Sequence, residues 1–150
     1  MKVKIEISQD ATCEVIIRCR EINDEVLHLQ ALLTQKGSAE MPLYIGDDEY
    51  FVPKKDILFF ETSCGRVYAH TRERMYLCQN KLFELEQMLG VSFLRISKST
   101  VVNIMEIGSI HKELTGNGEI RFRRSDKTTY FSRGYAKILK DRIEEMRFGK

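Results

Sequence analysis

The sequence lacks any apolar run approaching the roughly 20 residues that a membrane-spanning helix requires. It also lacks a secretion signal, because residues 2–7 alternate polar and apolar side chains instead of forming an apolar block. These two absences exclude an integral membrane protein and a secreted one from our expectations. We therefore expect a cytoplasmic protein with no membrane insertion.

Closely spaced ligand pairs are missing as well. The chain has four cysteines and three histidines, but they are scattered and form no CxxC motif. Zinc sites usually show paired ligands at short spacing, so we expect no structural metal, and no motif indicates another cofactor. In a reducing compartment these thiols are most simply small core or surface residues.

The net charge is only +2, but its distribution is uneven. Residues 1–40 hold five Lys/Arg and seven Asp/Glu, whereas residues 93–150 hold thirteen and seven. A positive excess near the carboxyl terminus is consistent with a polyanionic partner. The length of 150 residues and the 43% hydrophobic content indicate one globular domain with an appendage.

The first 40 residues predict a strand and an amphipathic helix. Residues 3–7 alternate as a half-buried strand does. Between 15 and 33, apolar residues step by four and three positions, which indicates a helix with a narrow apolar seam: Val15, Cys19, Ile22, Val26, Leu29 and Leu33. The seam is too short to distinguish packing on its own domain from dimerisation. Residues 35–40 have linker composition.

From residue 43 the periodicity is that of strands. Residues 57–60 are so apolar that both faces of their strand should be buried. A short helix is expected at 80–90 and an amphipathic helix closes the chain from 132. Short strands are predicted at 43–45, 50–52, 57–61, 66–71, 75–78, 107–111, 119–123 and 128–131, and on both sides of a polar turn within 93–104. With no βαβ alternation, a mainly β, antiparallel sandwich or multi-sheet domain with flanking helices is predicted.

That polar turn, Ser97–Thr100, lies between two apolar, β-prone ends. Small hydroxyls around a single lysine suit hydrogen bonds to phosphates and base edges. The same four residues also fit an ordinary polar turn between strands.

Three segments resemble the LytTR DNA-binding domain family: ILFFE at 57–61, FLRISKSTVVN at 93–103 and FSRGY at 131–135. The resemblance covers about residues 43–147, and residues 1–40 form a separate appendage. It implies a bacterial transcription regulator that is not an enzyme. The implied fold is a stack of small antiparallel β-sheets whose loops enter successive major grooves of double-stranded DNA.

In this family, DNA-contacting side chains come from three loops. Carried over to this sequence, the resemblance implies Arg66 in the first loop, Ser97, Lys98 and Ser99 in the central loop, and Arg133 before the last helix. Lys98 occupies a variable position, so it should help to set which sequence is read.

Four further cations are candidate DNA contacts, and two of them, Arg121 and Arg123, are candidates for the DNA backbone. Arg95 projects from a strand and can reach a phosphate or cover its apolar neighbours. Lys127 is a candidate contact to the DNA backbone.

The residues before the domain number about 40, too few for the receiver domain of roughly 100 residues that usually precedes it. We therefore expect a stand-alone regulator that forms a homodimer through residues 3–33. A membrane sensor is another conceivable partner of that helix.

Two other functions compete with DNA binding. In one, the protein is an interaction module whose working surface is the helix at 15–33. In the other, Cys64 and His70, on two arms of one hairpin, form a nucleophile pair. No orienting third group accompanies them, so we expect no enzyme.

Overall fold

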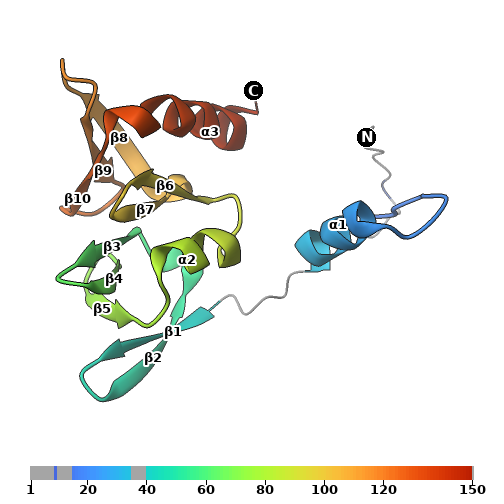
Figure 1. Cartoon of the computed structure of the whole chain (residues 1–150), viewed down its shortest axis with the longest axis horizontal. Coiled ribbons are helices and arrows are strands. Elements are labelled where there is room, and N and C mark those ends of the chain that lie inside the picture. The colour runs from blue at the N-terminus through green and yellow to red at the C-terminus, as the bar shows by residue number, and fades with distance from the viewer. Residues whose placement is uncertain (1–8, 10–14, 35–39, 150) are drawn as a thin grey trace. The chain divides into compact units, whose positions relative to one another are not determined.

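The structure is a computed structural model that describes residue 9, residues 15–34 and residues 40–149. The chain divides into two compact units, residues 1–37 and 38–150 (Figure 1). The strand predicted at residues 3–7 lies outside the described residues. Within those residues, no helix has the length and apolar character that crossing a membrane requires.

The first unit contains one described helix, α1 (Asp24–Thr34). The predicted helix therefore exists, but it begins about nine residues later than the apolar seam suggested, and residues 15–22 are irregular. Asn23 explains the start, because its side-chain oxygen accepts the Val26 N–H at 3.0 Å, which is the bond of a helix N-cap. The β-branched run at 15–17 also has low helix propensity.

The second unit is mainly β. All paired strands are antiparallel, and they form a seven-stranded sheet in the order β2-β1-β5-β4-β3-β7-β6 and a three-stranded sheet in the order β10-β9-β8. The strands are β1 (Glu40–Ile45), β2 (Asp48–Pro53), β3 (Phe59–Ser63), β4 (Arg66–His70), β5 (Met75–Cys78), β6 (Phe93–Ser97), β7 (Thr100–Asn103), β8 (Ile107–Lys112), β9 (Gly118–Phe122) and β10 (Thr128–Phe131). The helices are α2 (Leu82–Met88) and α3 (Ala136–Phe148), with 3-10 turns η1 (Lys54–Asp56), η2 (Ile104–Glu106) and η3 (Arg133–Tyr135). The predicted class, mainly β with antiparallel sheets and flanking helices, is confirmed.

The strand β3 is shifted by two residues from the predicted range of 57–61. The Ile57 N–H closes the η1 turn on the Lys54 carbonyl at 3.1 Å, so strand pairing starts later. The strand consequently extends to Ser63, and the hairpin to β4 turns through Cys64 and Gly65 alone. Their φ values of 51° and 75° are those of a tight turn whose twist matches the flanking strands.

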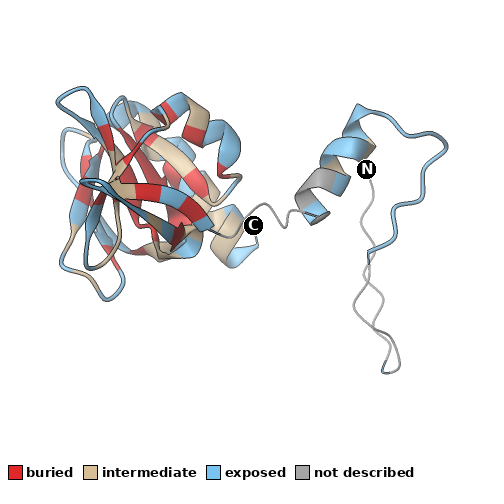
Figure 2. Cartoon of the chain, turned by 90° about the horizontal axis from the view of Figure 1, so that it is seen from below, coloured by how far each residue is buried: buried red, intermediate tan, exposed pale blue. Residues whose placement is uncertain are grey.

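Two cores lie on opposite faces of β3 and β7. Phe60 and Val101 face the first core, which α2 covers through Leu85. The neighbouring Phe59 and Val102 face the second core, which α3 covers through Leu139. Figure 2 shows the buried residues, in red, concentrated on the strands of this unit. Both faces of β3 are therefore buried at these positions, as the apolar run predicts.

Asn103 is the polar residue that closes the junction between the cores. Its side chain is buried, with the amide donating to the Ile57 carbonyl at 2.9 Å and the side-chain oxygen accepting the Met105 N–H at 3.1 Å. It thereby satisfies two backbone groups where the chain leaves regular strands.

Candidate nucleic-acid interface

Backbone hydrogen bonds join three loops of the second unit. The Thr62 N–H, at the end of β3, donates to the Ser99 carbonyl at 2.8 Å. The Ser132 N–H, before η3, donates to the Ile96 carbonyl at 2.9 Å. The β3–β4 turn, the β6–β7 turn and the segment before α3 are thus neighbours, and the rigid strands fix their spacing.

A β-bulge shapes the central loop. Arg95 pairs with Val101 but Ser97 pairs with Thr100, so Ile96 is an extra residue on β6. Its side chain is buried in the second core while its carbonyl receives Ser132. A bulge of this kind bends a strand and redirects the residues that follow. Here those residues are the polar turn that the sequence singled out.

Within that turn the two serines hold the backbone. The Ser97 hydroxyl accepts the Ser99 N–H at 3.2 Å, and the two hydroxyl oxygens are 3.4 Å apart. Lys98 lies between them and is exposed. Its amino group has no hydrogen-bond or ion-pair partner among the described residues, so it is available to a ligand.

Arg66 begins β4 and pairs with Ser63 across the tight turn. It is exposed, and in the part of the chain that the structure describes its guanidinium meets no acceptor. The predicted cation of the first loop is therefore presented next to the central loop.

Arg133 is held through its backbone and stem. Its N–H donates to the Asn117 side-chain oxygen at 2.8 Å. A Cβ built on Gly116 would come within 2.6 Å of the Arg133 Cγ, so the β8–β9 turn needs glycine there to accommodate this stem. The guanidinium is exposed and, over residues 15–34 and 40–149, contacts no carboxylate. The sequence did not indicate the supporting roles of Gly116 and Asn117.

Arg95, in contrast, is engaged inside the molecule. All three guanidinium nitrogens donate: Nε to the Ser97 carbonyl at 2.8 Å, one terminal nitrogen to the Lys98 carbonyl, and the other to a Glu86 carboxylate oxygen at 3.1 Å. The Arg95 side chain is 24% exposed. The structure places this predicted residue beside the central loop, where its guanidinium bonds to the loop backbone.

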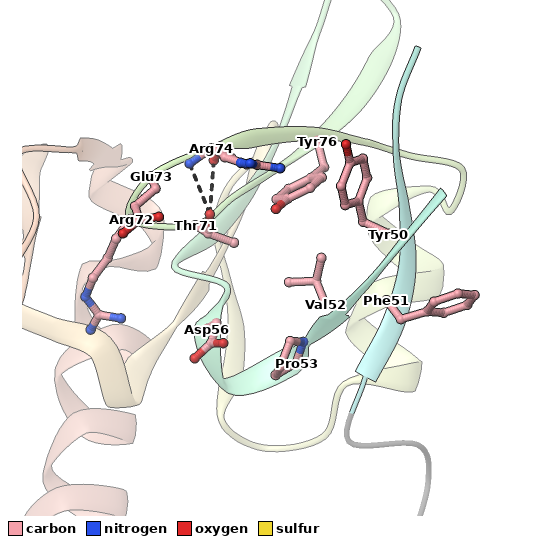
Figure 3. A pocket seen from close by; sticks show the side chains of 10 residues that line it. All are labelled: Tyr50, Phe51, Val52, Pro53, Asp56, Thr71, Arg72, Glu73, Arg74 and Tyr76. Atoms are coloured by element: carbon pink, nitrogen blue, oxygen red, sulfur yellow. Dashed lines mark hydrogen bonds between the residues drawn. The ribbon is translucent and has the colours of Figure 1, made fainter. Parts of the chain in front are cut away.

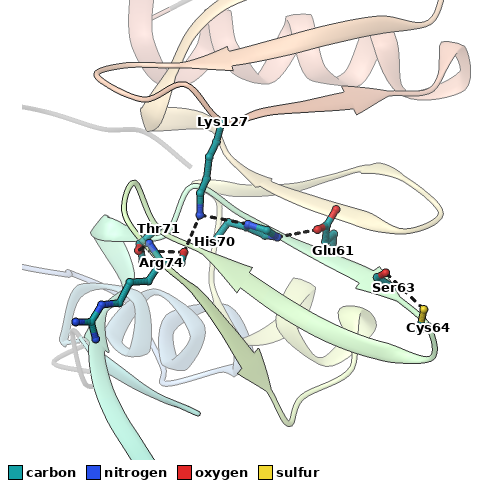
Figure 4. Close-up of polar contacts among 7 residues, drawn as sticks. All are labelled: Glu61, Ser63, Cys64, His70, Thr71, Arg74 and Lys127. Atoms are coloured by element: carbon teal, nitrogen blue, oxygen red, sulfur yellow. Dashed lines mark hydrogen bonds and ion pairs between the residues drawn. The ribbon is translucent and has the colours of Figure 1, made fainter. Parts of the chain in front are cut away.

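Lys127 also makes internal bonds (Figure 4). Its Nζ donates to the Arg74 carbonyl at 2.7 Å and lies 3.4 Å from His70 Nδ1. Because an ammonium only donates, Nδ1 acts as the acceptor, and the His70 Nε2–H is left to donate to Glu61 at 2.7 Å. Desolvation lowers the pKa of Lys127, which the charge of Glu61 opposes. This chain of bonds connects β3 and β4 to the loop before β10.

His70 is neutral in this arrangement. Burial lowers its pKa, and although the hydrogen bond and charge of Glu61 oppose the change, they do not overcome it. The ring stacks on Phe59 with centroids 4.3 Å apart, and Phe59 stacks on Phe122.

Cys64 and His70 do not form a nucleophile pair. The β3–β4 register places His70 opposite Phe59, whereas Cys64 belongs to the turn at the other end of the hairpin. Cys64 is exposed, and its sulfur accepts only a weak contact from the Ser63 hydroxyl at 4.0 Å. The geometry that the enzyme alternative requires is absent.

A hollow of about 470 Å³ lies between β2 and the β4–β5 turn (Figure 3). Its charges are of both signs, since Asp56 and Glu73 share it with two arginines, and Arg74 sits 5.6 Å from the centroid of the Tyr50 ring. The hollow adjoins the His70 end of β4, whereas Arg66 begins the strand. It is therefore separate from the three loops.

These features place the second unit in the class of mainly β domains that present unpaired cations on adjoining loops. Residues 47–144 match the model of a known family, the LytTr DNA-binding domain. The match spans more than half of the chain, and the chain belongs to this family.

Relatives and a solved structure agree with that assignment. The chain is 31% identical over 149 residues to an uncharacterized HTH-type transcriptional regulator of Staphylococcus aureus (strain bovine RF122 / ET3-1), covering 95% of this chain and 98% of the relative. A second relative of the same description, from strain NCTC 8325 / PS 47, is 32% identical over 146 residues with the same coverage. The fold is similar, with a TM-score of 0.64 and 21% identity, to the LytTr DNA-binding domain of a protein described as a methyl-accepting/DNA response regulator from Bacillus cereus. That similarity covers 69% of this chain and 95% of the solved one.

The names of the S. aureus relatives refer to a helix-turn-helix. In the described part of this chain, five strands separate α1 from α2 and five more separate α2 from α3. No two of these α-helices are consecutive, so the described elements do not form that motif.

Proposed function

We propose that the second unit binds double-stranded DNA sequence-specifically by placing its three adjoining loops in the major groove. The chain then acts as a bacterial transcription regulator in the cytoplasm, where the chromosome lies. One observation carries this proposal: three loops that are hydrogen-bonded to one another each present a cation with no partner in the described part of the chain.

In this function the cations have different tasks. Arg66 and Arg133 have the planar donor fork that binds guanine in the major groove or bridges phosphates. Lys98, flanked by hydroxyls, supplies a flexible donor at the central loop. The hydroxyls of Ser97 and Ser99 are 3.4 Å apart, so when one donates to the other, the proton of the second remains for a phosphate or base acceptor. Arg95 and Lys127, which we predicted as contacts, are assigned supporting roles because their charged groups are bonded internally.

Selection from a random duplex pool, followed by binding across a salt series, tests this function. We expect a preferred sequence and a steep fall in affinity with salt, because each neutralised phosphate contributes a slope of about −0.9. The variant Arg66→Ala/Lys98→Ala/Arg133→Ala should lose the preference. Lys55→Ala is the matched control. Lys55 is exposed on η1, before β3, whereas the turn that presents Arg66 follows β3. A wild-type protein that enriches no sequence would refute the proposal and favour the interaction-module alternative.

We further propose that the protein dimerises through residues 3–33, with a second copy as the partner. On α1, Leu27 is 50% and Leu33 55% exposed, and Ile22, just before the helix, is 74% exposed. Large apolar side chains exposed this close together are typical of an interaction surface. A two-fold dimer would carry two copies of the DNA-binding unit for two half-sites.

The native mass of the full chain at micromolar concentration tests the dimer. Leu27→Asp/Leu33→Asp should shift the mass from dimer to monomer, whereas Glu25→Gln, an exposed control on the same helix, should not. A monomeric wild type would contradict the dimer and would point to a different partner for α1, such as a membrane sensor.

A further inference from the structure

The central loop is held from behind by a residue pair that joins two elements. Arg95 lies on β6 and Glu86 on α2, and their charged groups are 3.1 Å apart. The same guanidinium donates to the carbonyls of Ser97 and Lys98, the first two residues of the polar turn. One side chain therefore contacts the loop at two successive peptide groups and the helix at a third point.

The bulge at Ile96 directly precedes the two carbonyls that Arg95 contacts. Extending β6 by Ile96 breaks the regular ladder between Arg95 and Ser97, and the Ile96 carbonyl is used by Ser132. After the bulge, Ser97 forms the last pair of the ladder with Thr100, and Lys98 lies in the turn. A planar guanidinium fork can donate to the carbonyls of both residues at once. Arg95 does so, and the Glu86 carboxylate fixes the remaining terminal nitrogen.

We propose that Arg95 and Glu86 form a latch that sets the direction of Lys98. Arg95 is then a positioning residue, and α2, which carries Glu86, supports the central loop. In the absence of the latch, Lys98 still carries its charge but is spread over several directions. Attraction to phosphates, which depends on charge and little on direction, is then retained. Discrimination between bases, which depends on direction, is lost.

The latch's effect on base discrimination presupposes the DNA binding proposed above, whereas its effect on loop order does not. Two measurements on the full chain therefore separate the two ideas. The first is amide exchange without DNA, followed at Ser99, whose N–H bonds to the Ser97 hydroxyl, and at Thr62, whose N–H bonds to the Ser99 carbonyl. The second is binding to the duplex that the wild type enriches from a random pool, to its single-base-pair variants, and to an unselected duplex of equal length.

The variants are Arg95→Met, which keeps much of the stem, and Glu86→Leu, which leaves the arginine in place. Both should speed exchange at Ser99 and Thr62, and both should reduce discrimination at the base pair that Lys98→Ala affects, by roughly 5- to 150-fold, the range for one good base contact. Combining Arg95→Met with Lys98→Ala should cost no more discrimination than Lys98→Ala alone, because both act through one contact. In Arg95→Met and Glu86→Leu, the dependence of DNA affinity on salt concentration should keep its wild-type slope.

Glu86→Gln keeps an acceptor and should restore most of the discrimination lost in Glu86→Leu. Glu145→Leu removes a similar charge from an exposed position on α3 and should leave both measurements unchanged. Should Arg95→Met fail to fold, Glu86→Leu and its rescue by glutamine decide the matter.

Two results would overturn the latch. One is a salt slope lowered by about one in Arg95→Met together with tighter binding in Glu86→Leu, which is the behaviour of a phosphate-contacting arginine that Glu86 weakens. The other is unchanged exchange at Ser99 and Thr62 in both variants. If instead the wild type enriches no duplex while exchange responds as expected, DNA reading is refuted and the latch stands as a device that orders the loop.

Discussion

Asn103 gives the sharpest test of how the second unit is held together. Asn103→Ala removes two hydrogen bonds at once, to the Ile57 carbonyl and from the Met105 N–H. Ile57 is fully buried, so water cannot replace the lost donor at its carbonyl. Each bond contributes about 1 kcal/mol net, and a buried group left without a partner costs about 1–3 kcal/mol. We therefore expect the free energy of unfolding to fall by roughly 2–4 kcal/mol.

Urea unfolding followed by circular dichroism measures this change in free energy. In thermal unfolding, the midpoint temperature should fall by roughly 10 °C for a unit of this size. Asn117→Ala is the matched control, because Asn117 also accepts a backbone N–H but at an exposed site. Water can replace that acceptor, so its removal should cost under about 1 kcal/mol. A loss for Asn103→Ala no larger than for Asn117→Ala would refute the reasoning.

Three more predictions concern single positions. Cys64→Asn should raise the free energy of unfolding by roughly 0.5–1 kcal/mol, because the φ of 51° strains most residues but suits asparagine; a loss in urea unfolding would contradict this. Gly118→Ala should lower it by roughly 1–3 kcal/mol, since a Cβ there meets the Phe131 ring and the His111 carbonyl, whereas Gly134→Ala, with open space around it, should not. His70→Gln should make the free energy of unfolding less sensitive to acid. Because burial lowers the pKa of His70, its contribution to stability is present above about pH 6.5 and is lost as the pH falls below 6.5. Wild-type and variant stabilities that stay parallel between pH 7 and pH 5 would contradict this.

Strand positions followed closely from the sequence because short apolar runs and turn residues alternate throughout the second unit. The β3 boundary was off by two residues, since the η1 turn that consumes the Ile57 N–H leaves no periodic signal. Helix α1 begins late because an N-cap asparagine interrupts a seam that looks continuous by spacing alone. Local hydrogen bonds decided both cases, where hydrophobic periodicity could not.

The sequence pointed to the exposed candidate residues, whose contact with DNA stays a prediction, but not to the residues that support them. Arg66, Lys98 and Arg133 were identified through the family resemblance, and each is exposed with no partner in the described ranges. The engagement of Arg95 with Glu86 depends on a bulge and on the placement of α2, neither of which spacing encodes. Lys127 is likewise captured by residues more than fifty positions away.

Base analogues placed singly in the selected duplex test the central claim, reading of the major groove by the three loops, most directly. Replacing a contacted purine by its 7-deaza analogue removes one major-groove acceptor, and we expect wild-type affinity to fall by about 1–3 kcal/mol at such positions. The same replacement should have no effect in Arg66→Ala or Arg133→Ala at the position that each arginine reads. Replacing guanine by inosine, which removes only a minor-groove donor, should leave affinity unchanged. Sensitivity to inosine together with indifference to 7-deaza purines would contradict the account.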